Sequence, residues 1–574
     1  MEIQVDMMEH LGDLLSSGDV NSIKEMIAED SFTSFLQEKS SDLIPVLCCY
    51  LNEETMLNDQ RLFRYVKKII TMCAEIGNSK ECFMEFLAQM ETLDELKFQN
   101  LLQPVQTTIL RIPERKAPLM HCVYSVVYSF INTLPVPTDY NLEKEAKAVL
   151  ECDENVRRIR ENYHLIFRFY EPFVAELEGK CNDSIRILNL RSALVQALLH
   201  LLGHPLAFSD MEQNEKGPTS LGLLACKIVQ AVHKLQSDPV QLLFLVENKE
   251  LISVEEEKLS MTDFSSNEFK HSDLSVAVFF YLFVCESDKV LIPYTYSRLF
   301  IFSNCFTLAS ILLQFKETLV LRKGLLLAKA AITMVEEGTL PFSHLAFGVH
   351  KEVIDHLSTI AVYHNLEENR KLAVELIRKH FSLFEPKAKF YILVRNDSST
   401  KHPQLFGFFA SILTSLVRES FSRAELKPYF FGKRLSDLLN IYCSLKNGAE
   451  TDLLENKDQI IAALNLIIFL SRRDRSNITN VWSYVSVLQE NFLKPLREAI
   501  DLSRAHFKEE MKTLDDPEKN KTSEELEVTV GNELLGKMSV QEKKEVINSG
   551  LTVFDLIEHV LSRANECVED KPEL

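Results

Sequence analysis

Apolar residues recur at helical spacing along almost the whole chain. The run QRLFRYVKKIITMCAEI at 60–76 is a clear example, and similar runs occupy 41–51, 193–202, 221–235, 323–337 and 402–420. Short polar or proline-containing breaks separate these runs. The period-two alternation of β-strands never persists for more than a few residues. The pattern therefore predicts an all-α protein made of many consecutive amphipathic helices.

One predicted helix is apolar around more of its circumference than a surface helix needs to be. Between Gly448 and Asp474, an apolar stripe is widened on both sides; its members are Ile460, Ile461, Ala463, Leu464, Leu466, Ile467, Ile468, Phe469 and Leu470. The run is too short to span a bilayer, so protein must cover it on more than one side. This favours irregular HEAT-like repeats of antiparallel helix pairs stacked as an elongated α-solenoid. No strict repeat consensus is found, and a large irregular helical bundle is the alternative.

The composition agrees with a folded helical protein. Only 16 glycines and 18 prolines occur among 574 residues, fewer than turn-rich β architectures use, and 46% of the residues are hydrophobic. A chain of this length is also too long for one compact core. We therefore expect several domains or one extended repeat array.

The formal net charge of −20 narrows the classes of partner. Binding to nucleic acid or to an anionic membrane depends on lysine and arginine, so neither is expected as the main partner. The charge is uneven, because residues 401–574 carry 23 basic and 28 acidic side chains and residues 1–400 carry the remaining −15. An acidic chain favours basic protein partners, and its C-terminal part is the less repulsive place for a partner to dock.

The twelve cysteines are scattered and form no C-x-x-C motif, which is typical of free thiols in a reducing compartment. The N-terminus lacks the apolar core of a signal peptide, and no apolar run is long enough to span a membrane. We expect a monomer in the cytoplasm, with a nuclear pool as an alternative.

Two polar segments divide the predicted helices. Residues 248–272 are acidic and serine-rich, and residues 508–528 are a charge run. We therefore expect an N-terminal HEAT-like region at 1–247, an acidic loop at 248–272, central helical repeats at 273–400 and a C-terminal helical region at 401–574. The last region would contain a loop at about 508–528, followed by a pair of helices at 540–550 and 551–569.

Motifs that carry chemistry are scarce. Gly531, Gly536 and Lys537 match G-x-x-x-x-G-K, but Met538 stands where a phosphate-binding loop needs a hydroxyl. His200 and His204 lie four residues apart but lack the glutamate of a zinc-protease motif, so packing or capping is the favoured role. No catalytic residue, cofactor or metal is expected.

Several strings of this sequence resemble the glomulin family. They are NLLQPVQTTILRI (100–112), SFINTLPVP (129–137), GAETDLLENKDQIIAALNLIIFL (448–470), Trp482 followed by ENFLKPL (490–496), SRAHFKEEM (503–511) and FDLIEHVLSR (554–563). They occur in the family's order and spacing, most densely after residue 400. Trp482 itself falls at a position that helical spacing would bury.

The resemblance implies a stoichiometric inhibitor of cullin–RING ubiquitin ligases rather than an enzyme. Such a protein binds the RING domain of the RING-box subunit, which is held by the cullin, and masks the surface that recruits the ubiquitin-conjugating enzyme. Immunophilins and a receptor tyrosine kinase are further partners implied by the resemblance.

The family-like strings supply the candidate contact residues. They are Phe554, Asp555, Glu558 and Arg563 in the tail, Asn491, Phe492 and Lys494 in NFLKPL, and Glu450 and Asp452 in GAETDLL. Each has a structural alternative: Phe554 as core, Asp452 as a helix N-cap, and Lys494-Pro495 as the shaper of a kink. Two other functions stay open, namely a general helical-repeat scaffold and a nucleotide hydrolase that uses Gly531–Lys537.

Overall fold

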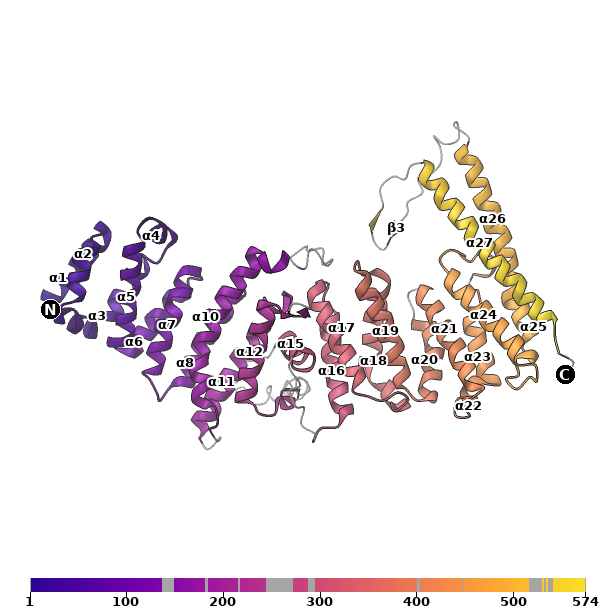
Figure 1. Ribbon diagram of the computed structural model, residues 1–574, viewed down its shortest axis with the longest axis horizontal. Coiled ribbons are helices and arrows are strands. Elements are labelled where there is room, and N and C mark those ends of the chain that lie inside the picture. Colours follow the sequence, from indigo (N-terminus) through magenta and orange to yellow (C-terminus); the bar gives the residue numbers. More distant parts are fainter. Residues whose placement is uncertain are drawn as a thin grey trace, which may run out of the picture. The chain divides into compact units, whose positions relative to one another are not determined.

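The computed structural model describes residues 2–572 except 137–148, 181–183, 215–216, 244–271, 287–294, 400–402, 446, 516–528, 531–532 and 535–539. Helices dominate the described chain (Figure 1), which confirms the predicted all-α fold. The chain divides into two compact units, Met1–Met334 and Val335–Leu574. The boundary expected at 400/401 therefore falls inside the second unit. The acidic loop expected at 248–272 lies outside the described residues, except for Ser272.

The first unit is a succession of helices with one small strand pair. Its elements are α1 (Glu2–Ser17), α2 (Val20–Ile27), α3 (Asp30–Cys48), α4 (Glu53–Asn58), α5 (Gln60–Ile76), α6 (Ser79–Met90), α7 (Glu95–Leu110), α8 (Lys116–Ile131), η1 (Leu150–Cys152), α10 (Glu154–Leu177), α11 (Ile185–Leu201), η2 (Leu206–Phe208), β1 (Gln213–Asn214), β2 (Gly217–Pro218), α12 (Ser220–Leu235), η3 (Pro239–Leu243), α15 (Asp273–Tyr281), η4 (Leu282–Glu286), α16 (Arg298–Leu313) and α17 (Thr318–Thr333). Strands β1 and β2 pair antiparallel.

Helix α5 shows how the sequence specifies these elements. Asp59 caps its N-terminus, because the Asp59 carboxylate accepts a 2.9 Å hydrogen bond from the backbone N–H of Leu62. Apolar residues then recur at helical spacing, and Val66, Ile69 and Ile70 are buried against α3 and α7. The same logic continues along the unit, where α6 packs on α7, α11 on α8 and α12, and α16 on α17.

The two longest helices of the second unit, α26 and α27, lie at its C-terminal end. Its elements are η5 (Phe342–Ala346), α18 (Gly348–Tyr363), α19 (Glu367–Leu383), α20 (Pro386–Ser399), α21 (Pro403–Ser420), α22 (Lys427–Phe430), α23 (Lys433–Tyr442), η6 (Gly448–Glu450), α24 (Lys457–Arg473), η7 (Val481–Ser483), α25 (Val485–Leu488), η8 (Gln489–Leu493), α26 (Lys494–Asp515), β3 (Thr529–Val530), β4 (Glu533–Leu534) and α27 (Val540–Glu569). Strands β3 and β4 pair antiparallel.

Helix α24 is the widely apolar segment of the sequence, and protein covers it on two sides. It packs against α21 on one side and α27 on another. Residues Ile460, Leu464, Leu466, Ile467 and Leu470 are buried. The expected coverage is therefore confirmed.

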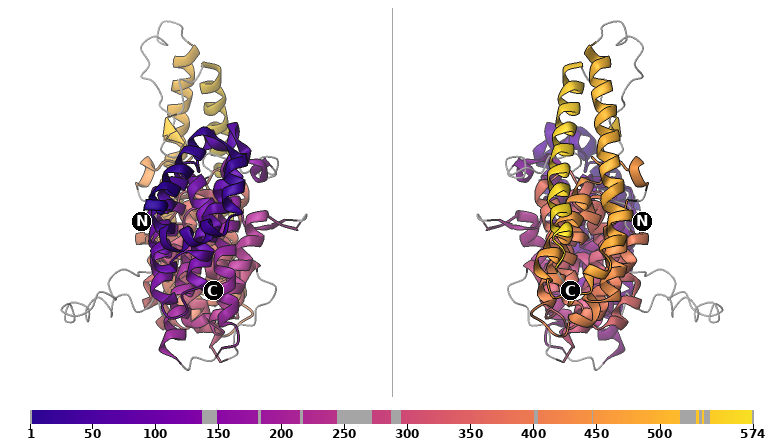
Figure 2. Two further views of the ribbon diagram at one scale, coloured as in Figure 1. Left: turned by 90° about the vertical axis from the view of Figure 1, so that its left-hand side faces the viewer. Right: turned by 90° about the vertical axis from the view of Figure 1, so that its right-hand side faces the viewer.

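The C-terminal end of the unit differs from the sequence-based expectation in two ways. Helix α26 continues to Asp515, so the loop expected from residue 508 does not begin there. Residues 540–569 form the single helix α27 rather than two helices separated at Gly550. Helices α26 and α27 lie side by side and antiparallel (Figures 1 and 2). We call this pair the C-terminal hairpin.

Among the described residues, one segment is long and apolar enough to cross a membrane by length and composition. It is Ile185–Phe208, with a mean hydropathy of 1.3. In the first unit, 56% of the most apolar part of this segment is buried, as in the core helix of a globular protein. This is weak support for a membrane span.

Candidate partner-binding surface on the C-terminal hairpin

An aromatic pair holds the two helices of the C-terminal hairpin together. The ring of Phe554 on α27 is 1% exposed and meets the ring of Phe507 on α26 edge-on, with centroids 5.2 Å apart and planes at 83°. Ile557 and Leu561 follow Phe554 on the buried face of α27, which packs on α24. The hairpin is thus anchored to the rest of the unit through α27.

Gly550 explains why α27 does not end where the sequence suggests a break. A Cβ atom at this position would lie 2.8 Å from Cε1 of Phe507 and 3.4 Å from Cδ1 of Leu454. Glycine therefore permits a close approach of α26 to α27 inside a continuous helix. The glycine is a packing residue here, and the sequence pattern alone does not distinguish this role from a helix stop.

An ion-pair cluster spans the exposed side of the hairpin. Nη2 of Arg504 donates to Oδ1 of Asp555 and Oε2 of Glu558, each at 2.7 Å, and Nη1 of Arg497 donates to Oε1 of Glu558 at 2.7 Å. The hydrogen bond from Arg504 lowers the pKa of Glu558 below its ordinary value, and the Coulomb attraction of both arginines acts in the same direction. Two of the candidate residues, Asp555 and Glu558, are therefore brought together by arginines of the neighbouring helix.

Two leucines of the hairpin are largely exposed. Leu502 on α26 is 58% exposed, and Leu556, between Asp555 and Glu558 on α27, is 51% exposed. Arg563 is exposed further along α27, and the described part of the chain offers it no partner. Exposed apolar residues next to charged ones are a feature of protein-binding surfaces.

Phe554 and Phe492 occupy core positions. Phe554 is 1% exposed and Phe492 is fully buried. A partner could reach neither ring without a rearrangement of the unit. Exposed neighbours such as Leu556 therefore replace them as candidate contacts.

The GAETDLL segment also lies against the hairpin. The turn η6, which ends at Glu450, packs on α26, and Glu450 itself is exposed. Asp452 is not a helix N-cap, because α24 begins at Lys457 and its N-cap residue is Asn456. Instead, the Oδ1 of Asp452 accepts hydrogen bonds from the backbone N–H groups of Leu454 at 2.8 Å and Glu455 at 3.0 Å and closes the turn before α24. Three separate family-like segments therefore converge on one part of the second unit.

The NFLKPL segment joins the hairpin to the helix before it. Asn491 and Lys494 are exposed, and Lys494, the first residue of α26, pairs with Glu490 in the preceding turn η8. The π-helical turn η8 ends at Leu493, two residues before Pro495, whose missing N–H and ring prevent a regular α-helical connection. The expected kink-shaping role of Lys494-Pro495 agrees with this geometry.

Trp482 is buried, as its spacing predicts, and its ring N–H joins a group of hydrogen bonds centred on Asp474, which we call the polar hub. Its Nε1 donates to the carbonyl oxygen of Asp474 at 2.7 Å. The buried carboxylate of Asp474 accepts hydrogen bonds from the backbone N–H groups of Ile478 and Thr479, each at 2.7 Å. This hub fixes the turn after α24. The next residue, Arg475, pairs with Asp570 just beyond the end of α27.

Sequence reasoning missed four residues of the exposed hairpin face: Arg497, Leu502, Arg504 and Leu556. Arg504 lies in the family-like string SRAHFKEEM, but its carboxylate partners are more than 50 residues away in the sequence. The signal for Leu502 and Leu556 is that each departs from the buried stripe of its own helix.

The remaining chemical candidates do not form a recognisable site. The Nδ1 of His200, on α11, lies 3.0 Å from the hydroxyl of Tyr124, whereas His204 follows the end of that helix. No group of metal-ligating side chains occurs among the residues that the structure describes. Gly531, Gly536 and Lys537 lie outside the described residues.

Comparison with known proteins gives the family. The profile of a family described as "Uncharacterised protein family, YAP/Alf4/glomulin" matches residues 227–544, more than half of the chain. The chain belongs to the YAP/Alf4/glomulin family. It is 26% identical to glomulin of Mus musculus over 572 residues and 24% identical to glomulin of Homo sapiens over 575 residues. Each alignment covers 97% of this chain and 92% of the relative.

The similarity to the glomulins is not confined to one unit. Alignments of this extent take in both compact units, including most of the C-terminal hairpin or all of it. Such a relationship favours a role in protein–protein interaction.

Proposed function

We propose that this chain is a non-catalytic inhibitor of cullin–RING ubiquitin ligases. It acts as a monomer in the cytoplasm and binds the RING domain of the RING-box subunit through the C-terminal hairpin. This blocks recruitment of the ubiquitin-conjugating enzyme. The observation that carries the proposal is the similarity to two glomulins over 97% of the chain. Immunophilins and a receptor tyrosine kinase are proposed as further partners.

The exposed face of the hairpin suits this role. A surface that receives a conjugating enzyme has an apolar centre and a polar rim. Leu502 and Leu556 provide exposed apolar area, and the Arg504 cluster and Arg563 provide charges on the same two helices. Because the two helices are held by the Phe507–Phe554 pair and the ion pairs, little conformational entropy is lost on binding.

Inhibition by such a surface needs no catalytic residue. Occupation of the RING excludes the conjugating enzyme by competition, so the effect depends on the two concentrations and affinities. The mechanism therefore predicts that excess conjugating enzyme restores activity.

A reconstituted ubiquitylation assay tests the proposal. A purified cullin–RING-box ligase is titrated with this protein, and ubiquitin chain formation is measured at several concentrations of conjugating enzyme. We expect a dose-dependent loss of chains that extra conjugating enzyme relieves. Absence of inhibition, together with absence of a complex on a sizing column, would contradict the proposal and favour the general scaffold.

Surface variants locate the binding face. The double variant Leu502→Asp/Leu556→Asp should weaken inhibition at least about tenfold, because charge would replace the apolar centre of the interface. A matched control is Leu57→Asp/Met84→Asp, which changes the same charge at residues 76% and 63% exposed in the first unit. Equal inhibition by both double variants would refute the assignment to the hairpin.

Two single variants test the candidates from the sequence. Glu558→Ala and Arg563→Ala should each weaken RING binding while the protein stays folded, since Arg563 is exposed and Glu558 is only half-buried. Unchanged affinity in both variants would contradict the placement of the RING on this face.

A further inference from the structure

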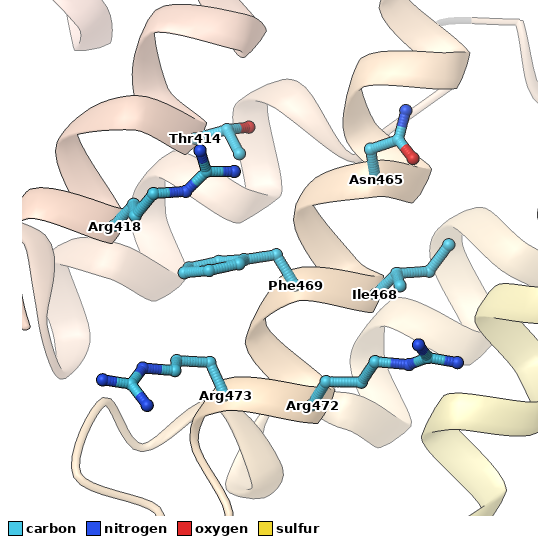
Figure 3. Close-up of a pocket in the computed structure, with 7 residues that line it drawn as sticks. All are labelled: Thr414, Arg418, Asn465, Ile468, Phe469, Arg472 and Arg473. Carbon is cyan, nitrogen blue, oxygen red and sulfur yellow. The ribbon is translucent and has the colours of Figure 1, made fainter.

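An open depression lies between α21 and α24 in the second unit, apart from the ion-pair cluster of the hairpin. It has a volume of about 490 Å³. Its side chains include three arginines, Arg418, Arg472 and Arg473, around the apolar residues Ile468 and Phe469 (Figure 3). We call it the arginine depression. Its volume falls in the range of about 300–1,000 Å³ that ligand sites in proteins commonly have.

Aromatic rings hold two of the arginines in place. The guanidinium carbon of Arg418 lies 5.2 Å from the ring centroid of Phe469, and that of Arg473 lies 5.6 Å from the ring centroid of Phe421. The two rings are themselves edge-to-face, with centroids 6.1 Å apart. Figure 3 shows Arg418 and Arg473 on opposite sides of Phe469. Stacking restrains a guanidinium while its N–H edges remain available to an anion.

These arginines lack the carboxylate partners that other arginines of the unit have. Arg504 and Arg475 form ion pairs with acids of α27 or the residues that follow it. Among the residues that the structure describes, no ion pair involves Arg418, Arg472 or Arg473. Arg472 donates from Nε to the Sγ atom of Cys567 at 3.3 Å. Among the described residues, three arginines without a carboxylate partner thus line one depression.

We propose that the arginine depression binds a phosphorylated side chain on a segment of a partner protein. A phosphate carries nearly two negative charges and three acceptor oxygens, which suit several guanidinium groups at once. The half-buried ring of Phe469 would contact an apolar residue next to the phosphorylated one. Thr414 and Asn465 add hydroxyl and amide groups to the lining.

The charge distribution argues for a compact anion rather than an extended one. Nucleic acids and anionic vesicles need basic residues along an extended surface. Here three arginines line one depression, while the chain as a whole carries a net charge of −20 and repels such polyanions. A single phosphate requires only the local cluster.

The test uses the full chain and short synthetic peptides. Arrayed peptides with a central phosphoserine and randomised flanks are probed beside their unphosphorylated and glutamate counterparts. Retained sequences are then titrated by fluorescence anisotropy. We expect phosphorylated peptides to bind at least about tenfold more tightly than their glutamate counterparts, since a carboxylate carries less charge and fewer acceptors. Equal binding of all three forms would overturn the proposal.

A charge-matched pair of variants locates the site. The double variant Arg418→Gln/Arg473→Gln should weaken phosphopeptide binding at least about thirtyfold, because two charge-assisted contacts are lost. The control Arg423→Gln/Arg434→Gln removes the same charge in the same unit, and it includes Arg434, which is likewise stacked on aromatic rings. The control should bind like wild type, with both variants unfolding at the wild-type temperature.

The remaining outcomes count against the site. Equal losses in both double variants, unchanged binding in Arg418→Gln/Arg473→Gln, or no binding of any phosphopeptide would each overturn it. Preferential binding of RNA or of vesicles containing phosphatidylserine, measured with the same variants, would do so as well. Since no ligase is present in these titrations, their result is independent of the inhibition assay.

Discussion

Replacing Phe554 by alanine distinguishes a core residue from a contact residue at the centre of the candidate surface. Phe554 belongs to a family-like string, and its ring is 1% exposed against Phe507. If the ring acts through packing, its removal will destabilise the second unit before it affects any partner. If the ring is instead a contact, binding will fall while stability is retained.

The structure sets the size of the expected effect. Truncation of a fully buried phenylalanine costs about 3–5 kcal/mol of the free energy of unfolding, because buried apolar area is lost and a cavity remains. The edge-to-face pair with Phe507 is part of this cost. We expect a value within this range, since α24 and α26 hold both sides of the site and limit its collapse.

Trp482 provides the assay. It is the only tryptophan of the chain, it lies in the second unit and it is 2% exposed, so its fluorescence reports the unfolding of that unit. With a slope of about 2–3 kcal/mol per molar urea, Phe554→Ala should lower the unfolding midpoint by about 1–2 M.

The adjacent surface residue is the control. Leu556→Ala, two positions along the same helix and 51% exposed, should change the unfolding free energy by no more than about 0.5 kcal/mol. The reasoning is refuted if Phe554→Ala unfolds at the wild-type urea concentration. Loss of RING binding in that stable variant would make Phe554 a contact residue after all.

Two further predictions concern the same unit and use the same fluorescence readout. Gly407→Ala should lower the unfolding free energy by about 1–3 kcal/mol, because a Cβ atom there would lie 2.7 Å from the backbone nitrogen of Gln459 on α24; Gly348→Ala, which meets no atom closer than 3.8 Å, should be near neutral. His350 and His380 form a buried pair with 2.9 Å between Nδ1 and Nε2. Burial lowers the pKa of His350 from 6.5 to about 4 and that of His380 well below its ordinary value, so the unfolded chain binds these protons at higher pH than the folded chain. Stability is therefore lost as the pH falls from about 6.5 toward 4, on the order of 2 kcal/mol by pH 5 from His350 alone, with His380 acting in the same direction. A urea midpoint that is the same at pH 7 and pH 5 would contradict this.

The sequence specifies those parts of the fold that depend on local signals. The bounds of α5 could be predicted because Asp59 marks its N-terminus and an unbroken apolar period follows. The coverage of α24 followed from the width of its apolar stripe. Each inference needs only residues within one helix, whose burial pattern reflects its own spacing.

The continuity of α27 depended on a distant residue. Gly550 looks like a helix stop within its own segment, and only the position of Phe507 on α26 shows that the glycine permits close packing. The same limit applies to Asp555 and Glu558. Their carboxylates could be assigned to the exposed face of a helix, but the arginines that pair with them come from another helix.

This limit bears directly on how a binding surface can be inferred from one sequence. Helical period separates the buried face from the exposed face, so it could have removed Phe554 and Phe492 from the contact candidates. It cannot rank the exposed residues, because their chemistry depends on which neighbours the fold supplies. Arg504 is satisfied by two carboxylates, whereas Arg418 and Arg473 have aromatic neighbours and no carboxylate partner among the described residues. The three have the same side chain and differ only in these surroundings. The sequence does not show which neighbours each arginine has, so only the fold reveals the arginine depression.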